Sequence, residues 1–143
     1  MSLLQELSRQ LKSDEGLKLH AYTDTKGFLT IGYGRLIDKR RGGGLSQEEA
    51  EYLLSNDIAK RRATLTIMLP WMFQLDEARQ GVLLNMSFQM GVDGLMGFKK
   101  MLAACRDGRW AEAAEQMRQS QWAKETPERC KRLVHQMETG LWQ

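Results

Sequence analysis

Two carboxylic acids near the start of the chain, Glu15 and Asp24, are close enough in the sequence to act as a pair. Hydrolysis of a glycosidic bond needs one protonated carboxyl group that donates to the leaving oxygen. It also needs a second, ionised one that activates water or stabilises a cationic transition state. The two groups must therefore have different environments. Neighbouring leucines should partly desolvate Glu15, whereas Asp24 should lie in a wetter turn. By itself, this spacing is also typical of unrelated surface charges.

A helix and a β-hairpin should position these carboxylates. Ser2 and Gln5 resemble a capping box, and leucines at helical spacing follow them, which predicts a first helix ending near residue 13. Two short runs, 19–22 and 28–33, flank a polar turn and read as strands, which predicts a hairpin. The glycine-rich stretch 38–44 is too polar for a core and should be an exposed loop.

Helical patterns cover most of the remaining chain. Ser46 and Glu49 form a capping pattern that starts a long helix, which should run over about 46–67. A helix capped by Asp76 and ending at Gly91 is apolar on most sides and should be the central buried one. Shorter helices are expected at 98–106, at 110–120, and from an N-cap at Thr126 to Gly140.

These elements predict an α+β fold that is mainly α, built as one domain with two lobes. A small β lobe would cover about 14–45, and the helix at about 46–67 would connect it to a larger helical lobe of residues 1–13 and about 68–143. Two lobes joined by a helix leave a groove between them, and such a groove can hold a polymer.

Composition and charge restrict the possible partners. The chain has 143 residues, of which 42% are hydrophobic and 27% charged, as in ordinary globular proteins. No run approaches the roughly 18 apolar residues of a membrane span. The net charge of +3 weakly favours an anionic partner, but no nucleic-acid recognition pattern accompanies it, so we expect no nucleic acid partner. Cys105 and Cys130 have no metal-ligand spacing, so we expect two buried thiols and no metal.

The segment 14–34 resembles the active-site segment of the T-even phage lysozymes, also called phage endolysins or muramidases. It carries Glu15, Asp24 and Thr30 at the spacing of that family's catalytic residues. Further segments are similar in the same order along nearly the whole chain: 85–91, 109–114, Trp122, 126–129 and 139–142.

This resemblance implies a lysozyme-like two-lobed fold and an inverting glycoside hydrolase without a cofactor. The implied reaction cleaves the β-1,4 bond between N-acetylmuramic acid and N-acetylglucosamine in peptidoglycan. Glu15 would be the general acid, Asp24 the base or electrostatic stabiliser, and Thr30 would help to hold the attacking water. The implied supporting residues are Leu36, Phe88 and Gln89 for substrate binding, and Arg129 for pairing with the catalytic glutamate.

The chain departs from the best-known family members at two places. Arg35 replaces a histidine that pairs with an aspartate on the long helix, and Asp57 lies at the matching position, so we expect an Arg35–Asp57 pair. The segment between Leu36 and Leu45 is also much shorter. Glycines end that segment, and Gly43 is interpreted either as part of a tight turn into the helix or as a hinge, of which we favour the hinge.

The implied partner is the glycan strand of peptidoglycan, bound by a monomer without stable membrane insertion. The first residues show no basic segment followed by an apolar stretch, so we expect synthesis in the cytoplasm of the host bacterium. A holin would then release the enzyme to the peptidoglycan in the periplasm. The alternative is a non-catalytic or tail-associated wall-binding module, although the presence of all three catalytic residues favours an enzyme. Trp110, Trp122 and Trp142 are expected in the core rather than at sugars.

Overall fold

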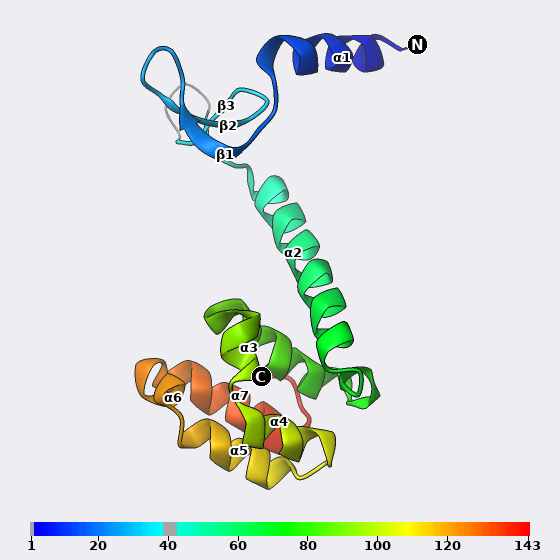
Figure 1. Ribbon diagram of the computed structural model, residues 1–143, viewed down its shortest axis with the longest axis vertical. Coiled ribbons are helices and arrows are strands. Elements are labelled where there is room, and N and C mark those ends of the chain that lie inside the picture. The colour runs from blue at the N-terminus through cyan, green and yellow to red at the C-terminus, as the bar shows by residue number, and fades with distance from the viewer. Residues whose placement is uncertain (1, 39–42) are drawn as a thin grey trace. The chain divides into compact units, whose positions relative to one another are not determined.

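The computed structural model describes residues 2–38 and 43–143 and divides the chain into two compact units, Met1–Leu54 and Ser55–Gln143 (Figure 1). Most of the described residues are helical, and they include one small antiparallel sheet. This confirms the predicted mainly α member of the α+β class. The assignment of residues 1–13 to the same lobe as the C-terminal helices stays a prediction.

The first unit begins with helix α1 (Leu3–Glu15). Its predicted capping box is confirmed, because the Ser2 hydroxyl accepts a hydrogen bond from the Gln5 backbone and the Gln5 side chain accepts one from the Ser2 backbone. The helix ends two residues later than expected, at Gly16, where a φ of +68° turns the chain away from the helix axis. Glu15 is therefore the last residue of α1.

Three antiparallel strands follow, in the order β1 (Lys18–Thr23), β2 (Leu29–Gly32) and β3 (Arg35–Leu36). The hairpin of β1 and β2 is confirmed, whereas β3 was missed because two residues are too few for an alternating pattern. Thr30 lies in the centre of the sheet, opposite Tyr22 on one side and Leu36 on the other.

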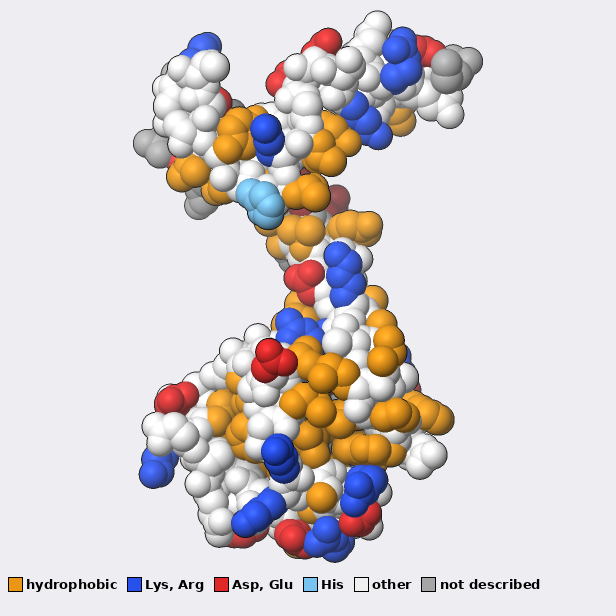
Figure 2. All heavy atoms as spheres, in the orientation of Figure 1, with side chains coloured by type: hydrophobic (Ala, Val, Ile, Leu, Met, Phe, Trp, Pro, Cys, Tyr) orange, Lys and Arg blue, Asp and Glu red, His pale blue; other side chains and the backbone are white. Residues whose placement is uncertain are grey.

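Helix α2 (Gln47–Met68) matches the predicted long helix within a residue at each end. Its capping pattern is confirmed, since the Glu49 backbone donates to the Ser46 hydroxyl at 3.1 Å and the Ser46 backbone donates to the Glu49 carboxylate at 3.0 Å. Of the predicted loop 38–44, residues 39–42 lie outside the described residues. In Figure 2, apolar side chains lie along α2, where Tyr52 and Leu54 are exposed.

The second unit is a helical unit built around α3 (Glu77–Met96). Asp76 caps α3 as predicted, and Gly91, with a φ of +78°, interrupts the helix where its end was expected, although helical residues resume as far as Met96. Buried apolar residues of α3, including Leu83, form the core together with the other helices. These are η2 (Met72–Gln74), α4 (Lys99–Arg106), α5 (Trp110–Arg118), α6 (Gln121–Glu125) and α7 (Pro127–Thr139).

The end of the chain confirms the predicted bounds of α7 and corrects the predicted place of Trp142. Thr126 is the N-cap of α7 and Pro127 follows it, as predicted, although the Thr126 hydroxyl donates back to the carbonyl of Trp122 at 3.2 Å and makes no capping bond to α7. Gly140 ends α7 in the left-handed conformation, as predicted. Trp142 follows this end and is 64% exposed, so its expected place in the core is wrong.

The other residues expected in the core lie there. Trp122 is buried, and Trp110 is partly buried, with the Arg79 guanidinium 4.1 Å from its ring centroid. Cys105 and Cys130 are both buried thiols, as predicted. Burial raises the pKa of the Cys105 thiol to about 12, which keeps it protonated at neutral pH. None of the helices formed by the described residues is both long and apolar enough to cross a membrane.

Candidate active site

Asp24 begins the turn between β1 and β2, and its side chain stabilises that turn. One carboxylate oxygen, Oδ1, accepts hydrogen bonds from the backbone of Lys26 at 2.9 Å and of Phe28 at 2.8 Å. The Gly27 backbone donates to the Asp24 carbonyl at 3.0 Å. The described residues donate no hydrogen bond to the second oxygen, Oδ2. The turn therefore fixes the orientation of the carboxylate and leaves one oxygen available.

The peptide groups of Phe28 connect Asp24 to Thr30. The Phe28 backbone donates to Asp24 Oδ1, and the Phe28 carbonyl accepts both from the Asp24 backbone at 2.8 Å and from the Thr30 hydroxyl at 3.1 Å. Thr30 is only 3% exposed. Because its hydroxyl proton is used in this bond, its oxygen can act only as an acceptor for another molecule. Two of the predicted catalytic residues thus share one hydrogen-bonded network.

Glu15 comes to the same unit from the end of α1, and its carboxyl group lies over the α-carbon of Gly34. The expected contrast in solvation is wrong within this unit, since Glu15 is exposed and Asp24 is half-buried. The neighbouring leucines do not cover Glu15, because Leu11 and Leu17 are themselves 46% and 51% exposed. The turn hydrogen bonds, by contrast, draw Asp24 against its own backbone.

The predicted pairing of Arg35 with Asp57, a residue of the second unit, stays a prediction, whereas within the first unit Arg35 forms an ion pair with Glu49. Its guanidinium lies 2.7 Å from the Glu49 carboxylate and also donates to the Gly44 carbonyl at 3.1 Å. Glu49 stands in the first turn of α2, whereas Asp57 lies about 12 Å farther along the helix axis. Arg35 therefore contacts the first turn of α2, where Glu48 and Glu49 are the acidic residues and Glu49 is the one that pairs with it.

Leu36, predicted to contact substrate, is half-buried in β3 beside Thr30. Phe88 and Gln89, predicted for the same role, lie in α3 of the second unit just before the break at Gly91. The side-chain oxygen Oε1 of Gln89 accepts a hydrogen bond from the indole of Trp122 at 2.8 Å, and the Phe88 ring has the Arg61 guanidinium 5.2 Å from its centroid.

Arg129 lies in α7, where its guanidinium donates to the side chain of Asn85 at 2.9 Å and to the Asn85 carbonyl at 3.3 Å. Both residues line a hollow of about 350 Å³ together with Arg132. The predicted pairing of Arg129 with Glu15 stays a prediction, and so does a groove that would join the two sets of site residues. The two hydrogen bonds to Asn85 hold the Arg129 guanidinium in a fixed orientation.

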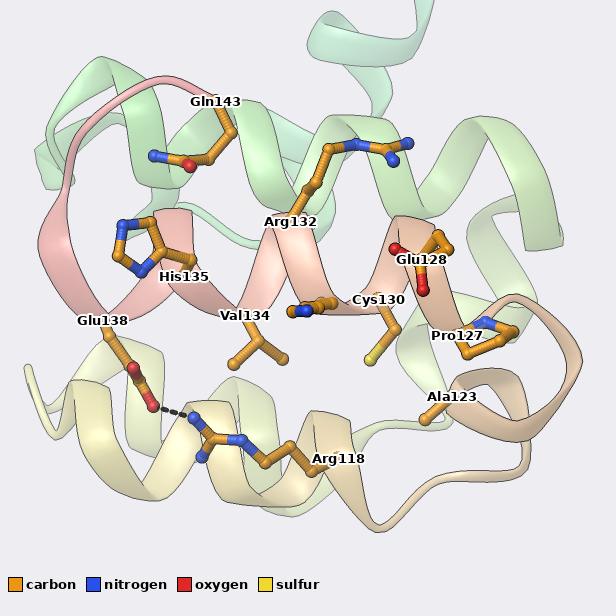
Figure 3. A pocket seen from close by; sticks show the side chains of 11 residues that line it. Arg118, Ala123, Pro127, Glu128, Cys130, Arg132, Val134, His135, Glu138 and Gln143 are labelled. Atoms are coloured by element: carbon orange, nitrogen blue, oxygen red, sulfur yellow. Dashed lines mark hydrogen bonds and ion pairs between the residues drawn. The ribbon is translucent and has the colours of Figure 1, made fainter.

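The second unit has two larger hollows. Gln89 and Trp122 line one of about 880 Å³, together with Phe98 and Ser120. The other, of about 730 Å³, lies along α7 (Figure 3), and Arg118 forms an ion pair with Glu138 at its edge. None of the residues that the sequence predicted for the site lines the hollow of Figure 3. Of these two larger hollows, the one of about 880 Å³ therefore includes a predicted site residue, Gln89.

The sequence model of the phage lysozyme family matches residues 12–139, which include every predicted site residue. The chain is 32% identical to Probable T4-type lysozyme 1 of Dictyostelium discoideum over 164 aligned positions, which cover 96% of each chain. The chain belongs to the phage lysozyme family. The alignment has more positions than this lysozyme has residues, which number 143, so this lysozyme has gaps where its relative has residues.

Two further relatives of this lysozyme come from phages. It is 32% identical to the Pre-baseplate central spike protein Gp5 of Enterobacteria phage T4 over 159 positions, which cover 94% of this lysozyme but only 28% of Gp5. It is 39% identical to an Endolysin of Acyrthosiphon pisum secondary endosymbiont phage 1 over 59 positions, which cover 41% of this lysozyme and 40% of the endolysin. The protein is thus a lysozyme-type glycosidase that hydrolyses peptidoglycan.

Sequence reasoning missed two groups that position the site residues of this lysozyme. Asn85 lies one helical turn before Gln89, on the same face of α3, and this spacing could have indicated it. The peptide groups at Phe28 carry no side-chain signal, although an aspartate followed by Gly27 is typical of a turn that folds back on its own backbone. Among the described residues, no cluster of three metal-ligating side chains occurs.

Proposed function

We propose that this lysozyme hydrolyses the β-1,4 bond between N-acetylmuramic acid and N-acetylglucosamine, with Glu15, Asp24 and Thr30 as its catalytic residues. The observation that carries the proposal is the network through Phe28, which fixes the Asp24 carboxylate and the Thr30 hydroxyl relative to each other. Fixed acceptors are what a hydrolase needs to orient a water molecule before it attacks.

In this mechanism, the water donates one hydrogen bond to Oδ2 of Asp24 and one to the hydroxyl oxygen of Thr30, and Asp24 takes the first of these protons as the water attacks. The lone pair of the water then points at the anomeric carbon of the sugar. Glu15 acts from the other side as the general acid and gives its proton to the leaving oxygen. Attack on the face opposite the leaving group inverts the anomeric centre. No cofactor takes part in these steps.

The remaining predicted residues support this reaction. We assign substrate contacts to Leu36, Phe88 and Gln89, and a role in holding the Glu15 carboxylate to Arg129. Leu36 is the partner of Thr30 across the sheet, which supports its assignment. The bond from Trp122 leaves the amide group of Gln89 with a free donor end, which suits a sugar or peptide carbonyl.

The test uses purified peptidoglycan and the chemical form of the ends that are released. We expect reducing N-acetylmuramic acid ends by mass spectrometry, and the α-anomer in the first NMR spectra because the cleaved bond is β. Anhydro ends would show lytic transglycosylation instead and would contradict the proposed use of water. Release of a β-anomer would contradict inversion.

We further propose that the lysozyme is a monomeric endolysin that lyses the host from within, after a holin admits it from the cytoplasm to the wall. The similarity to an endolysin supports this role, whereas the similarity to Gp5 favours a tail-associated role as the second candidate. Expression in a bacterium separates the two. An endolysin lyses the culture only when a holin is expressed with it, whereas presence of the protein in purified phage particles would favour the tail.

A further inference from the structure

Gly34 lies directly under the carboxyl group of Glu15. A β-carbon added at Gly34 would be 2.8 Å from Glu15 Oε2, 3.3 Å from Cδ and 3.7 Å from Cγ. These are the three nearest atoms to that position, and all belong to Glu15. Gly34 follows β2 in the sequence, whereas Glu15 ends α1. The missing side chain of Gly34 therefore leaves the space that the Glu15 carboxyl group occupies.

Gly32 provides a comparison within the same segment. Its φ is +72° and that of Gly34 is +77°, so an alanine would be strained to a similar degree at either position. A β-carbon at Gly32, however, would meet nothing within 4 Å. The two glycines thus share a backbone requirement, and only Gly34 adds a contact with the proposed general acid.

We propose that Gly34 is a positioning residue, which holds the carboxyl group of Glu15 where it can reach the leaving oxygen. The inference rests on the proposed role of Glu15. Glutamate has three rotatable bonds and Glu15 is exposed, so its carboxyl group needs support from its neighbours to stay in one place. A methyl group at position 34 would displace the flexible end of Glu15 rather than the backbone. Misplacement of a reacting group by about 1 Å can lower a rate about 100-fold.

The test compares Gly34→Ala with Gly32→Ala in the full chain. Three quantities are measured: the melting temperature, kcat and KM on purified peptidoglycan per folded molecule, and the ¹³C resonance of the Glu15 Cδ with its pH titration. The Glu15 resonance is the one that disappears in Glu15→Gln. The resonance reports on the carboxyl group without depending on catalysis.

We expect both substitutions to lower the melting temperature by similar amounts. Gly34→Ala should also lower kcat about 100-fold with little change in KM, and should shift the Glu15 resonance, whereas Gly32→Ala should change neither. Equal kcat in the two variants would overturn the proposal. It would also be overturned if Gly34→Ala failed to fold while Gly32→Ala folded, because the methyl group would then disturb the backbone. Full activity of Glu15→Gln would instead contradict the proposed function, and that result is read independently of either glycine.

Discussion

In the second unit, Leu83, Met86 and Leu95 are completely buried, whereas in the first unit Leu19 and Leu29 are more than half exposed. Among the described side chains, every buried apolar one lies at Leu65 or later in the chain, and Thr30 is the buried residue of the first unit. The second unit is thus held by a packed core. The first unit depends instead on caps, turns and backbone hydrogen bonds.

The two units therefore contribute differently: the first positions the proposed catalytic side chains, and the second stabilises the fold. In the first unit, hydrogen bonds to single backbone groups position Asp24 and Thr30, and a glycine leaves the space that Glu15 occupies. Such positions depend little on the volume of apolar side chains. The packed core around α3 instead stabilises the fold, because its contribution to the free energy of unfolding increases with the apolar area that is buried. Substitutions in the two units should therefore have separable effects on stability and on activity.

The largest effect on stability is expected in the core of the second unit. Leu95→Ala should lower the free energy of unfolding by about 2–5 kcal/mol, because it removes buried methyl groups and leaves a cavity. Leu29→Ala, the same change at a position that is 56% exposed in the first unit, should alter it by about 0.5 kcal/mol or less. Urea denaturation followed by circular dichroism measures both. Equal losses would contradict the comparison of the two units.

An intermediate effect is expected at Gly43, which packs against backbone in the first unit. A β-carbon there would lie 2.0 Å from the Asp38 carbonyl oxygen and 2.7 Å from the β-carbon of Leu36. This packing supports the tight turn over the hinge that the sequence led us to favour. Gly43→Ala should cost about 1–3 kcal/mol by overpacking, with turnover per folded molecule unchanged.

Gly44→Ala is the control for this prediction. The φ of Gly44 is +81°, so an alanine there is strained, but the added β-carbon would meet its nearest atom at 3.5 Å, an ordinary van der Waals contact. Gly44→Ala should cost less than Gly43→Ala, about 1 kcal/mol. Melting curves and initial rates on the same preparations compare the two variants. Unchanged stability with slower turnover in Gly43→Ala would restore the hinge.

The smallest effect is expected for the ion pair of Arg35 and Glu49, which is exposed and screened by salt. Hydrogen bonds, the largest contribution from Arg35 and further ones from Ser46, lower the pKa of Glu49 from 4.5 to about 2. A carboxyl group whose pKa is lowered by folding stabilises the protein above its unfolded pKa. The wild type should therefore melt at a higher temperature than Glu49→Gln. This difference should have its full size above about pH 4.5 and should vanish as the pH falls through about 2.

Glu48→Gln, which removes a carboxyl group from the same turn of α2, is the matched control. A double-mutant cycle adds a second check, since the effects of Arg35→Ala and Glu49→Ala should not be additive, because the two residues are in contact. Additive effects of these two substitutions would contradict the ion pair.

The sequence predicted those parts of the fold that depend on local signals. Capping residues at Ser2 and Ser46 marked helix starts, and Gly91 and Gly140 marked a break and an end, because such groups act within a few residues of the chain. Trp142 was misplaced because its exposure depends on how the chain continues after α7, which periodicity does not describe.

For the candidate site, residue types and family spacing predicted the side chains but not their partners. The sequence assigned Arg35 to Asp57 by analogy, whereas within the first unit the structure pairs Arg35 with Glu49 at the start of α2. The network through Phe28 and the contact of Gly34 with Glu15 involve backbone atoms. Their partners are set by the register of the strands and by the turn, which only the three-dimensional structure gives.

The central claim is that Glu15 is the general acid, and one comparison of variants on purified peptidoglycan tests it most directly. Glu15→Gln keeps the shape of the side chain but cannot donate the catalytic proton, whereas Asp14→Asn makes the same kind of change at the preceding residue, which is also exposed. We predict that Glu15→Gln keeps the melting temperature and slows clearing by about 100-fold or more, while Asp14→Asn clears at the wild-type rate. Clearing by Glu15→Gln at the wild-type rate, at matched concentration, would contradict the account.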